Sequence, residues 1–253
     1  MRRGLYQSDK NFAFPYVLGR DFSGIIKSCG KNVTEFRPGD AVFGVLPTGR
    51  EGTYIEKLTI DANLVTIKPH ELEHNQAAAI ALTGLTALVA VEDDLALKKG
   101  EKILIHGGAG GVGSYAIQLS HYIGAEVITT ASPENNEYLY NLGADHIIDY
   151  NTQDFRNYVS DVDAVFDLIG GEVHQRSFEV LKSGGRIAYI APLTKNARPP
   201  RNDVNVIRPN VKRDRAHLNR IVELFMLNAV SSTDIQVFPL SSVNEAHELI
   251  ETN

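Results

Sequence analysis

Hydrophobic and polar positions follow two different patterns along this chain, and the change comes near Pro69. Before Pro69, short apolar runs separated by turn residues are typical of a β-rich segment. These runs lie at 24–26, 41–45 and 54–55. From 75 to 97 the chain is rich in Ala and Leu, with only Gly84 interrupting, which predicts a helix. We therefore expect a domain boundary near Pro69.

Beyond Pro69, apolar runs of strand length alternate with helical stretches. The predicted strands are 102–106, 126–131, 146–149, 163–168 and 186–190. The stretches between them are long enough for crossover helices, so the strands are expected to run parallel. This alternation predicts an α/β fold with a doubly wound parallel sheet. Two further helices are expected at 218–227 and 245–252.

Composition narrows the expected partners and location. The chain has 25 basic and 31 acidic side chains, a net charge of −6 and no long basic tract, so nucleic acid is not an expected partner. No run of about 18 apolar residues suggests a membrane span, and no secretory signal follows Met1. Cys29 is the only cysteine, which excludes a disulfide framework within the chain. We expect a cytoplasmic protein.

The sequence Gly108-Ala109-Gly110-Gly111-Val112-Gly113 is the main candidate for chemistry. It lies between a predicted buried strand and a predicted helix that ends at Gly124, which is the context of a dinucleotide-binding turn. Gly108 would permit the tight turn, Gly110 would let the backbone approach a pyrophosphate, and Gly113 would let the helix pack closely. The N–H groups of the helix start, including those of Gly111 and Val112, would then face the phosphates. The alternative is a structural turn that binds nothing.

The identity of the nucleotide depends on the end of the second strand. An acidic side chain there usually binds the ribose hydroxyls of NAD, whereas this strand ends in Ala131-Ser132. The missing carboxylate favours NADPH, and NADH stays the alternative because Glu134 could substitute for the acid. No Arg or Lys lies between Ser132 and Tyr150 to pair with a 2′-phosphate.

The sequence His70-Glu71-Leu72-Glu73-His74 spells the H-E-x-x-H motif of zinc peptidases. The motif needs a continuous helix to place both histidines on one face. Pro69 precedes it directly, so we expect a polar loop that leads into the helix and no metal site.

Together these motifs resemble the zinc-independent quinone oxidoreductases (zeta-crystallin-like) of the medium-chain dehydrogenase/reductase superfamily. The segments that carry the resemblance, besides the glycine turn, are Leu18-Gly19-Arg20-Asp21-Phe22-Ser23-Gly24, Phe36-Arg37-Pro38-Gly39-Asp40-Ala41-Val42, Gly52-Thr53-Tyr54, Leu82-Thr83-Gly84-Leu85-Thr86-Ala87, Leu142-Gly143-Ala144-Asp145, Asp167-Leu168-Ile169-Gly170-Gly171 and Gly184-Gly185-Arg186-Ile187. The resemblance implies a Rossmann cofactor domain at 69–235 and a smaller, incomplete GroES-like β-barrel domain at 1–68, joined by 236–253. It also implies a chain truncated at both ends, and a homodimer for which 204–211 supplies a sheet edge.

The resemblance also implies site residues. Tyr6 matches an active-site tyrosine, and Thr83 matches a residue beside the nicotinamide. Ser132 and Tyr150 match positions near the adenosine 2′-phosphate, and Gly170 matches a cofactor-binding position. Tyr6 and Thr83 also have structural alternatives, since Tyr6 lies near the N-terminus and the Thr83 hydroxyl can bond to the helix backbone.

The predicted reaction is NADPH-dependent reduction of a quinone or α,β-unsaturated carbonyl by hydride transfer without zinc. Zinc-dependent relatives have ligands at the positions matched by Arg20 and Ala79, which offer zinc no lone pair. Arg20 and Asp21 are expected to form a structural ion pair. The alternative function is an NADPH-binding protein that lacks catalysis because its substrate domain is incomplete.

Overall fold

The computed structural model describes residues 15–47, 49–50, 52–193 and 198–252. A parallel sheet of six strands forms its centre, in the order β6-β5-β4-β7-β8-β9. The strands are β4 (Lys102–His106), β5 (Glu126–Ala131), β6 (His146–Asp149), β7 (Val162–Asp167), β8 (Leu181–Tyr189) and β9 (Asn205–Ile207). This confirms the predicted doubly wound sheet, with a sixth strand at its edge.

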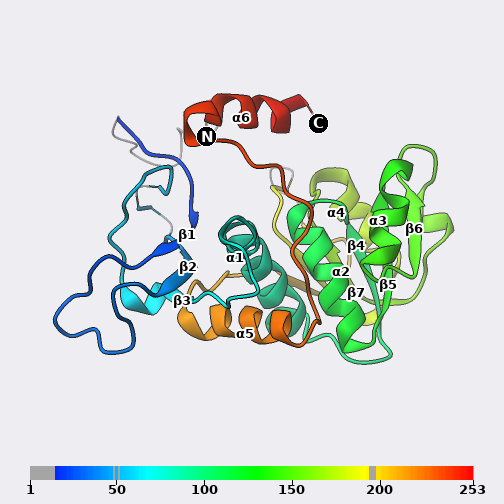
Figure 1. The fold of residues 1–253 in the computed structure, drawn as a ribbon. Coiled ribbons are helices and arrows are strands. Elements are labelled where there is room, and N and C mark those ends of the chain that lie inside the picture. The colour runs from blue at the N-terminus through cyan, green and yellow to red at the C-terminus, as the bar shows by residue number, and fades with distance from the viewer. Residues whose placement is uncertain (1–14, 48, 51, 194–197, 253) are drawn as a thin grey trace.

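Helices cover both faces of this sheet (Figure 1). They are α1 (His74–Leu88), α2 (Gly111–Ile123), α3 (Asn136–Asn141), α4 (Gly171–Ser177) and α5 (Arg215–Met226). A further helix, α6 (Val243–Thr252), stands apart from the sheet. A π-helical segment, Val89–Asp94, continues α1. As predicted, Gly124 ends α2 in the left-handed conformation, with φ 86°.

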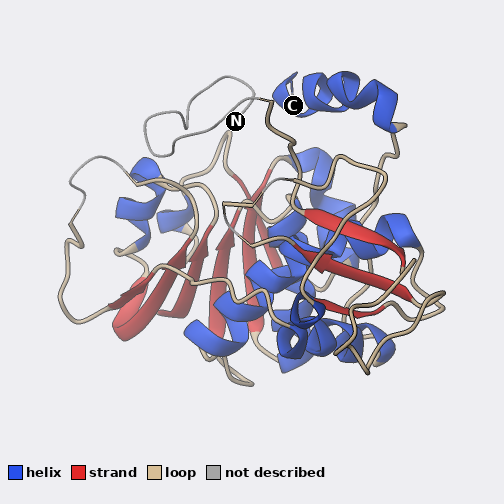
Figure 2. Cartoon of the chain, turned by 90° about the vertical axis from the view of Figure 1, so that its left-hand side faces the viewer, coloured by secondary structure: helices blue, strands red, loops and turns tan. Residues whose placement is uncertain are grey.

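A second sheet, antiparallel, contains β1 (Asp21–Ile25), β2 (Ala41–Val45) and β3 (Val65–Ile67). Its strands run in a clearly different direction from those of the parallel sheet (Figure 2). The run 54–55 was expected in a strand and is irregular instead, because the N–H of Tyr54 donates to the carbonyl of Leu18 outside any ladder. The phenol of Tyr54 lies 3.2 Å from Nε2 of His247 on α6. The predicted domain bounds stay a prediction.

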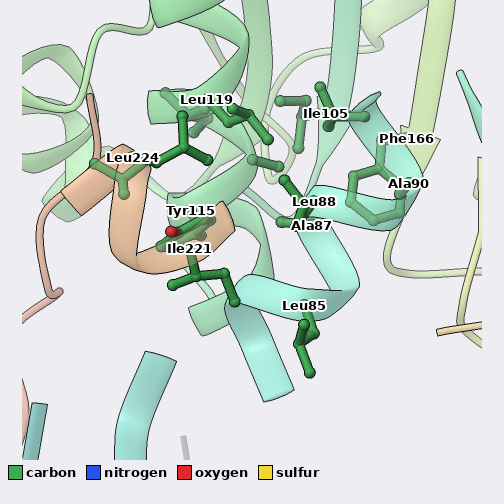
Figure 3. Packing of buried hydrophobic residues seen from close by; sticks show 14 of the residues in the cluster. Leu85, Ala87, Leu88, Ala90, Ile105, Tyr115, Leu119, Phe166, Ile221 and Leu224 are labelled. Carbon is green, nitrogen blue, oxygen red and sulfur yellow. The ribbon is translucent and has the colours of Figure 1, made fainter. Parts of the chain in front are cut away.

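The hydrophobic core has one cluster on each face of the parallel sheet. Along β4, Ile103 and Ile105 belong to one cluster and Leu104 to the other, and all three are fully buried. This is why the strand reads as a continuous apolar run. Helices α1, α2 and α5 meet in the larger cluster (Figure 3). A Cβ on Gly84 would lie 3.2 Å from Ile221 and 3.4 Å from the ring of Tyr115, so this glycine allows the three helices their close approach.

The continuous helical segment His74–Asp94 is apolar enough, with a mean hydropathy of 1.3, to pass a length and composition test for a membrane span. Most of this segment is buried in the core between the sheet and its neighbouring helices. We therefore interpret it as the core helix of the larger domain.

Candidate cofactor-binding site

The glycine turn joins β4 to α2 at the carboxyl edge of the parallel sheet, as predicted. Gly107 takes the left-handed position, with φ 79°, so the conformational freedom expected of Gly108 is needed one residue earlier. Gly108 is required for a different reason, since a Cβ there would overlap the hydroxyl of Thr129 on β5. A Cβ on Gly113 would overlap the carbonyl oxygen of Gly107. The glycine turn therefore packs too closely against β5 and the start of α2 to admit a side chain at Gly108 or Gly113.

Gly110 differs from the other residues of the turn because its free face is open. A Cβ there would meet no atom closer than the carbonyl oxygen of Gly107, 3.6 Å away. Gly110 is also the N-cap of α2, and no side chain caps the helix. Gly111, Val112 and Gly113 form the first turn of α2, and their N–H groups have no acceptor within the helix. An open cradle at the positive end of a helix dipole fits a pyrophosphate.

Thr83 lies beside this cradle. Its Cγ2 is 3.1 Å from the position that a Cβ on Gly111 would take. Its hydroxyl donates to the carbonyl of Ala79 over 2.7 Å, so the structural alternative raised by the sequence is present. The hydroxyl oxygen still has lone pairs. Thr83 can therefore accept a hydrogen bond at this position but has no proton left to donate.

Ser132 and Tyr150 follow two residues, Ala131 and Asp149, that are paired in the β5–β6 ladder, so the structure brings them to the same edge. The Ser132 hydroxyl donates to Glu134 over 2.6 Å. This hydrogen bond lowers the pKa of Glu134, which is fully exposed. Tyr150 is 61% exposed. A carboxylate is therefore present at this edge, although not at the strand end itself.

Gly170 is the N-cap of α4 and has φ 77°, and a Cβ there would lie 2.5 Å from the carbonyl oxygen of Pro192. Its N–H and that of Ile169 both donate to Oδ1 of Asp167, each over 2.9 Å. The other carboxylate oxygen of Asp167 bonds to His174 over 3.0 Å. Burial opposes ionisation of Asp167, but these hydrogen bonds outweigh it and hold its pKa below the usual value.

Our sequence interpretation missed this buried polar group, which also includes His106, the last residue of β4. The His106 ring lies 3.0 Å from Ser177 and 3.2 Å from Thr130. Burial lowers its pKa to about 4, so the ring is neutral at pH 7. Two features of the sequence could have indicated this group. They are the histidine directly before the glycine turn and the aspartate at the end of β7.

Asp21 connects the antiparallel sheet to the cofactor domain. Its carboxylate accepts the N–H of Leu82 on α1 over 2.7 Å. Among the described residues no close ion pair joins it to Arg20, although the positive charges of Arg20 and Arg213 both act to lower its pKa. Burial raises the pKa of Asp21 from 3.8 to about 6. Because the folded state holds this proton more tightly than the unfolded chain, stability should fall as pH rises from about 4 to about 6.

Asp21→Asn should remove this penalty. An amide oxygen can still accept the N–H of Leu82, while the buried charge is lost. A pKa rise of this size corresponds to at most about 3 kcal/mol. Urea unfolding should therefore show a more stable variant above pH 6.5, with the difference shrinking towards pH 4. Parallel pH profiles for the two proteins would contradict this account of Asp21.

The H-E-x-x-H motif does not lie on one continuous helix. His70 and Glu71 lie in a turn, and α1 begins only at His74. The Nδ1 atom of His74 instead lies 2.7 Å from the hydroxyl of Ser23. In the part of the chain that the structure describes, no group of three or more His, Cys, Asp or Glu could hold a metal. Tyr6 lies outside the described residues.

Comparisons with known proteins agree with this architecture. Residues 1–70 match the family described as "Alcohol dehydrogenase GroES-like domain", and residues 142–253 match "Zinc-binding dehydrogenase". The quinone oxidoreductase of Coxiella burnetii is 32% identical, with a TM-score of 0.84, over 98% of this chain and 78% of that one. The Escherichia coli quinone oxidoreductase complexed with NADPH is 25% identical, with a TM-score of 0.87, over 99% and 82%.

Curated relatives include the "NAD(P)H oxidoreductase RTN4IP1, mitochondrial" of Danio rerio, 36% identical over 72% of this chain. The human protein of the same name is 34% identical over 76%. The chain spans about half the length of these relatives (50%). The fold, the glycine turn and these matches together establish that the chain belongs to the medium-chain dehydrogenase/reductase superfamily and, within it, to the group of quinone oxidoreductases and their NAD(P)H-oxidoreductase relatives.

Proposed function

We propose that this protein binds NADPH at the glycine turn and reduces a quinone or an α,β-unsaturated carbonyl by hydride transfer without zinc. The observation that carries the proposal is the uncapped N-terminus of α2, with open space in front of Gly110. The relatives named as NAD(P)H and quinone oxidoreductases support the same reaction class.

Each part of the site has a task in this reaction. NADPH, when bound, supplies the hydride. The N–H groups of the first α2 turn bind its pyrophosphate. Thr83 accepts a hydrogen bond from the carboxamide of the nicotinamide and fixes the ring orientation. Arg20 and Ala79 stand at positions where zinc-dependent relatives have ligands and cannot bind zinc. Tyr6 would donate a hydrogen bond to the substrate carbonyl and stays a prediction.

A titration and a turnover assay test this function. Wild-type protein should bind NADPH saturably, and absorbance of the reduced nicotinamide should fall when a quinone or enone is added. Saturable binding without oxidation across a panel of quinones and enones would exclude catalysis and support the alternative, a cofactor-binding protein. Absence of binding at millimolar NADPH and NADH would exclude both functions.

The preference for NADPH can be tested at Asn135, whose amide donates to Ser132 over 2.9 Å. Asn135→Lys adds a cation beside Ser132 that can pair with a 2′-phosphate, so NADPH affinity should rise up to about tenfold, about 1.4 kcal/mol. NADH affinity should stay unchanged, because NADH has no 2′-phosphate. An equal gain for both cofactors would contradict the assignment of this edge to the 2′-phosphate.

The homodimer and the cytoplasmic location stay predictions. Strand β9 occupies one edge of the parallel sheet, so the segment 204–211 provides the edge that a second copy would pair with. Light scattering of the purified protein tests the dimer. The names of the vertebrate relatives include the word mitochondrial, so they do not support a cytoplasmic location.

A further inference from the structure

A cavity of about 320 Å³ lies in the domain of the antiparallel sheet, beside the end of β2. Leu46, which directly follows β2, lines it together with the apolar residues Val17, Ile55 and Leu58. Of the described residues that line this cavity, Arg50 is the charged one, and it is exposed. A cavity of this size can hold a small molecule. Its lining suits a ligand with an apolar body and a negative charge.

Two further arginines approach the cavity through Leu46. The N–H of Leu46 donates to the carbonyl oxygen of Arg20 over 2.9 Å. The carbonyl oxygen of Leu46 accepts from Nη1 of Arg213 over 3.3 Å. Burial and the positive charge of Arg20 lower the pKa of Arg213, so the two guanidinium groups lie within electrostatic range of each other. Arg20, Arg50 and Arg213 are therefore gathered around one residue of the cavity wall.

The positive charge of these three arginines is only partly offset. Asp21 is the described carboxylate that acts on Arg213, and with a pKa of about 6 it is largely ionised at pH 7. Among the described residues, no carboxylate forms a close ion pair with Arg20 or Arg50. Like charges held near one another repel, so the remaining positive charge favours the binding of an anion.

The start of β1 connects this cavity to the cofactor site. On one side, the carbonyl of Arg20 bonds to Leu46 at the cavity wall. On the other side, the carboxylate of Asp21 accepts the N–H of Leu82 on α1. Leu82 directly precedes Thr83, which lies beside the glycine turn. The cavity and its arginines are therefore one strand away from the residue proposed to orient the nicotinamide.

We propose that the substrate is an anion, an α,β-unsaturated ketone that carries a carboxylate, and that Arg20 and Arg50 bind its charge. The apolar body of the substrate occupies the cavity beside Leu46, and the partly buried Arg213 adds to the positive field. This proposal rests on the proposed function and names its substrate class. NADPH gives a hydride to the carbon β to the ketone, and a proton from water completes the α carbon, so NADP⁺ and the saturated keto acid form.

Steady-state turnover of trans-β-acetylacrylate and of its neutral methyl ester by the full chain tests the proposal. The two compounds differ by one charge. For wild type, the KM of the acid should rise with ionic strength and the KM of the ester should not, because salt screens the attraction. Arg20→Gln and Arg50→Gln should each lower the ratio of kcat/KM for acid to kcat/KM for ester about tenfold. Arg50→Lys should keep most of this ratio.

Arg37→Gln is the matched control, because it removes the same charge from a side chain that is 87% exposed in the loop between β1 and β2. It should keep the wild-type ratio. If Arg37→Gln lowers the ratio as much as the other two variants, the effect comes from net charge and the assignment to Arg20 and Arg50 is overturned. If wild type shows the same salt dependence for acid and ester, the anionic substrate is overturned.

Failure of the proposed function would look different. If wild type binds NADPH and reduces neither compound, catalysis fails, and the arginines are then tested by calorimetric binding of levulinate, the saturated product, and of methyl levulinate. Tighter binding of levulinate that is lost in Arg50→Gln supports the anion site, and equal binding of the two compounds overturns it. Arg50 is exposed, so its variant tests the proposal even where Arg20→Gln prevents folding.

Discussion

Gly110→Asp should abolish NADPH binding while leaving the fold intact. Gly110 has φ −73° and ψ 163°, which any residue can adopt, and a Cβ there meets open space. Aspartate is a favoured N-cap residue, so the melting temperature should stay the same or rise slightly. Its carboxylate would accept N–H groups of the first α2 turn and repel the pyrophosphate. We expect affinity to fall at least a hundredfold, about 3 kcal/mol.

Gly30→Asp is the matched control, because it adds the same charge at a glycine with no positive φ and no atom closer than 3.9 Å to the added Cβ. This position lies in the loop between β1 and β2, away from the glycine turn. The control should bind NADPH as wild type does. If Gly110→Asp also retained wild-type affinity, the phosphates would not bind at the start of α2.

Gly113→Ala should destabilise the whole cofactor domain. The added methyl would overlap the carbonyl oxygen of Gly107 and lie 2.8 Å from Cα of Gly108. Both contacts are backbone atoms, so neither can move without opening the turn. Overpacking of this kind costs about 1–3 kcal/mol or somewhat more. Denaturant unfolding should show the loss of stability, and NADPH binding should weaken with it.

Gly110→Ala is the control for this prediction. It makes the same substitution three residues earlier, where the added methyl meets open space, so it tests whether the steric overlap at Gly113 causes the loss of stability. It should change the free energy of unfolding by less than about 1 kcal/mol. Equal destabilisation by the two alanines would show that the close contact at Gly113 does not matter.

Much of the parallel sheet could be predicted from the sequence because its strands are buried on both faces and separated by helices. Strands β4, β5 and β6 have the predicted bounds. Strand β8 begins five residues earlier than predicted, because a register shift against β7 lets 181–185 join it and Gly184 takes φ 75° there. The short strand β3 was not predicted, since three residues carry too little pattern.

Part of the candidate site could also be predicted from the sequence, and part could not. The glycine turn has a local signature, and Thr83 and Ser132 were found through family motifs. The contacts of Asp167, His174 and His106 join different strands and a short helix. Periodicity identifies apolar faces and says nothing about which polar side chains are buried together. Only the fold shows that these residues meet beside Gly107.

The proposed function depends most directly on cofactor binding at the glycine turn. Fluorescence titration of wild type and Gly110→Asp with NADPH measures this in one experiment. We predict saturable binding to wild type and an affinity at least a hundredfold lower for Gly110→Asp, whose melting temperature should be equal to or slightly above that of wild type. Absence of binding to wild type at millimolar NADPH, or equal binding to both proteins, would contradict the account.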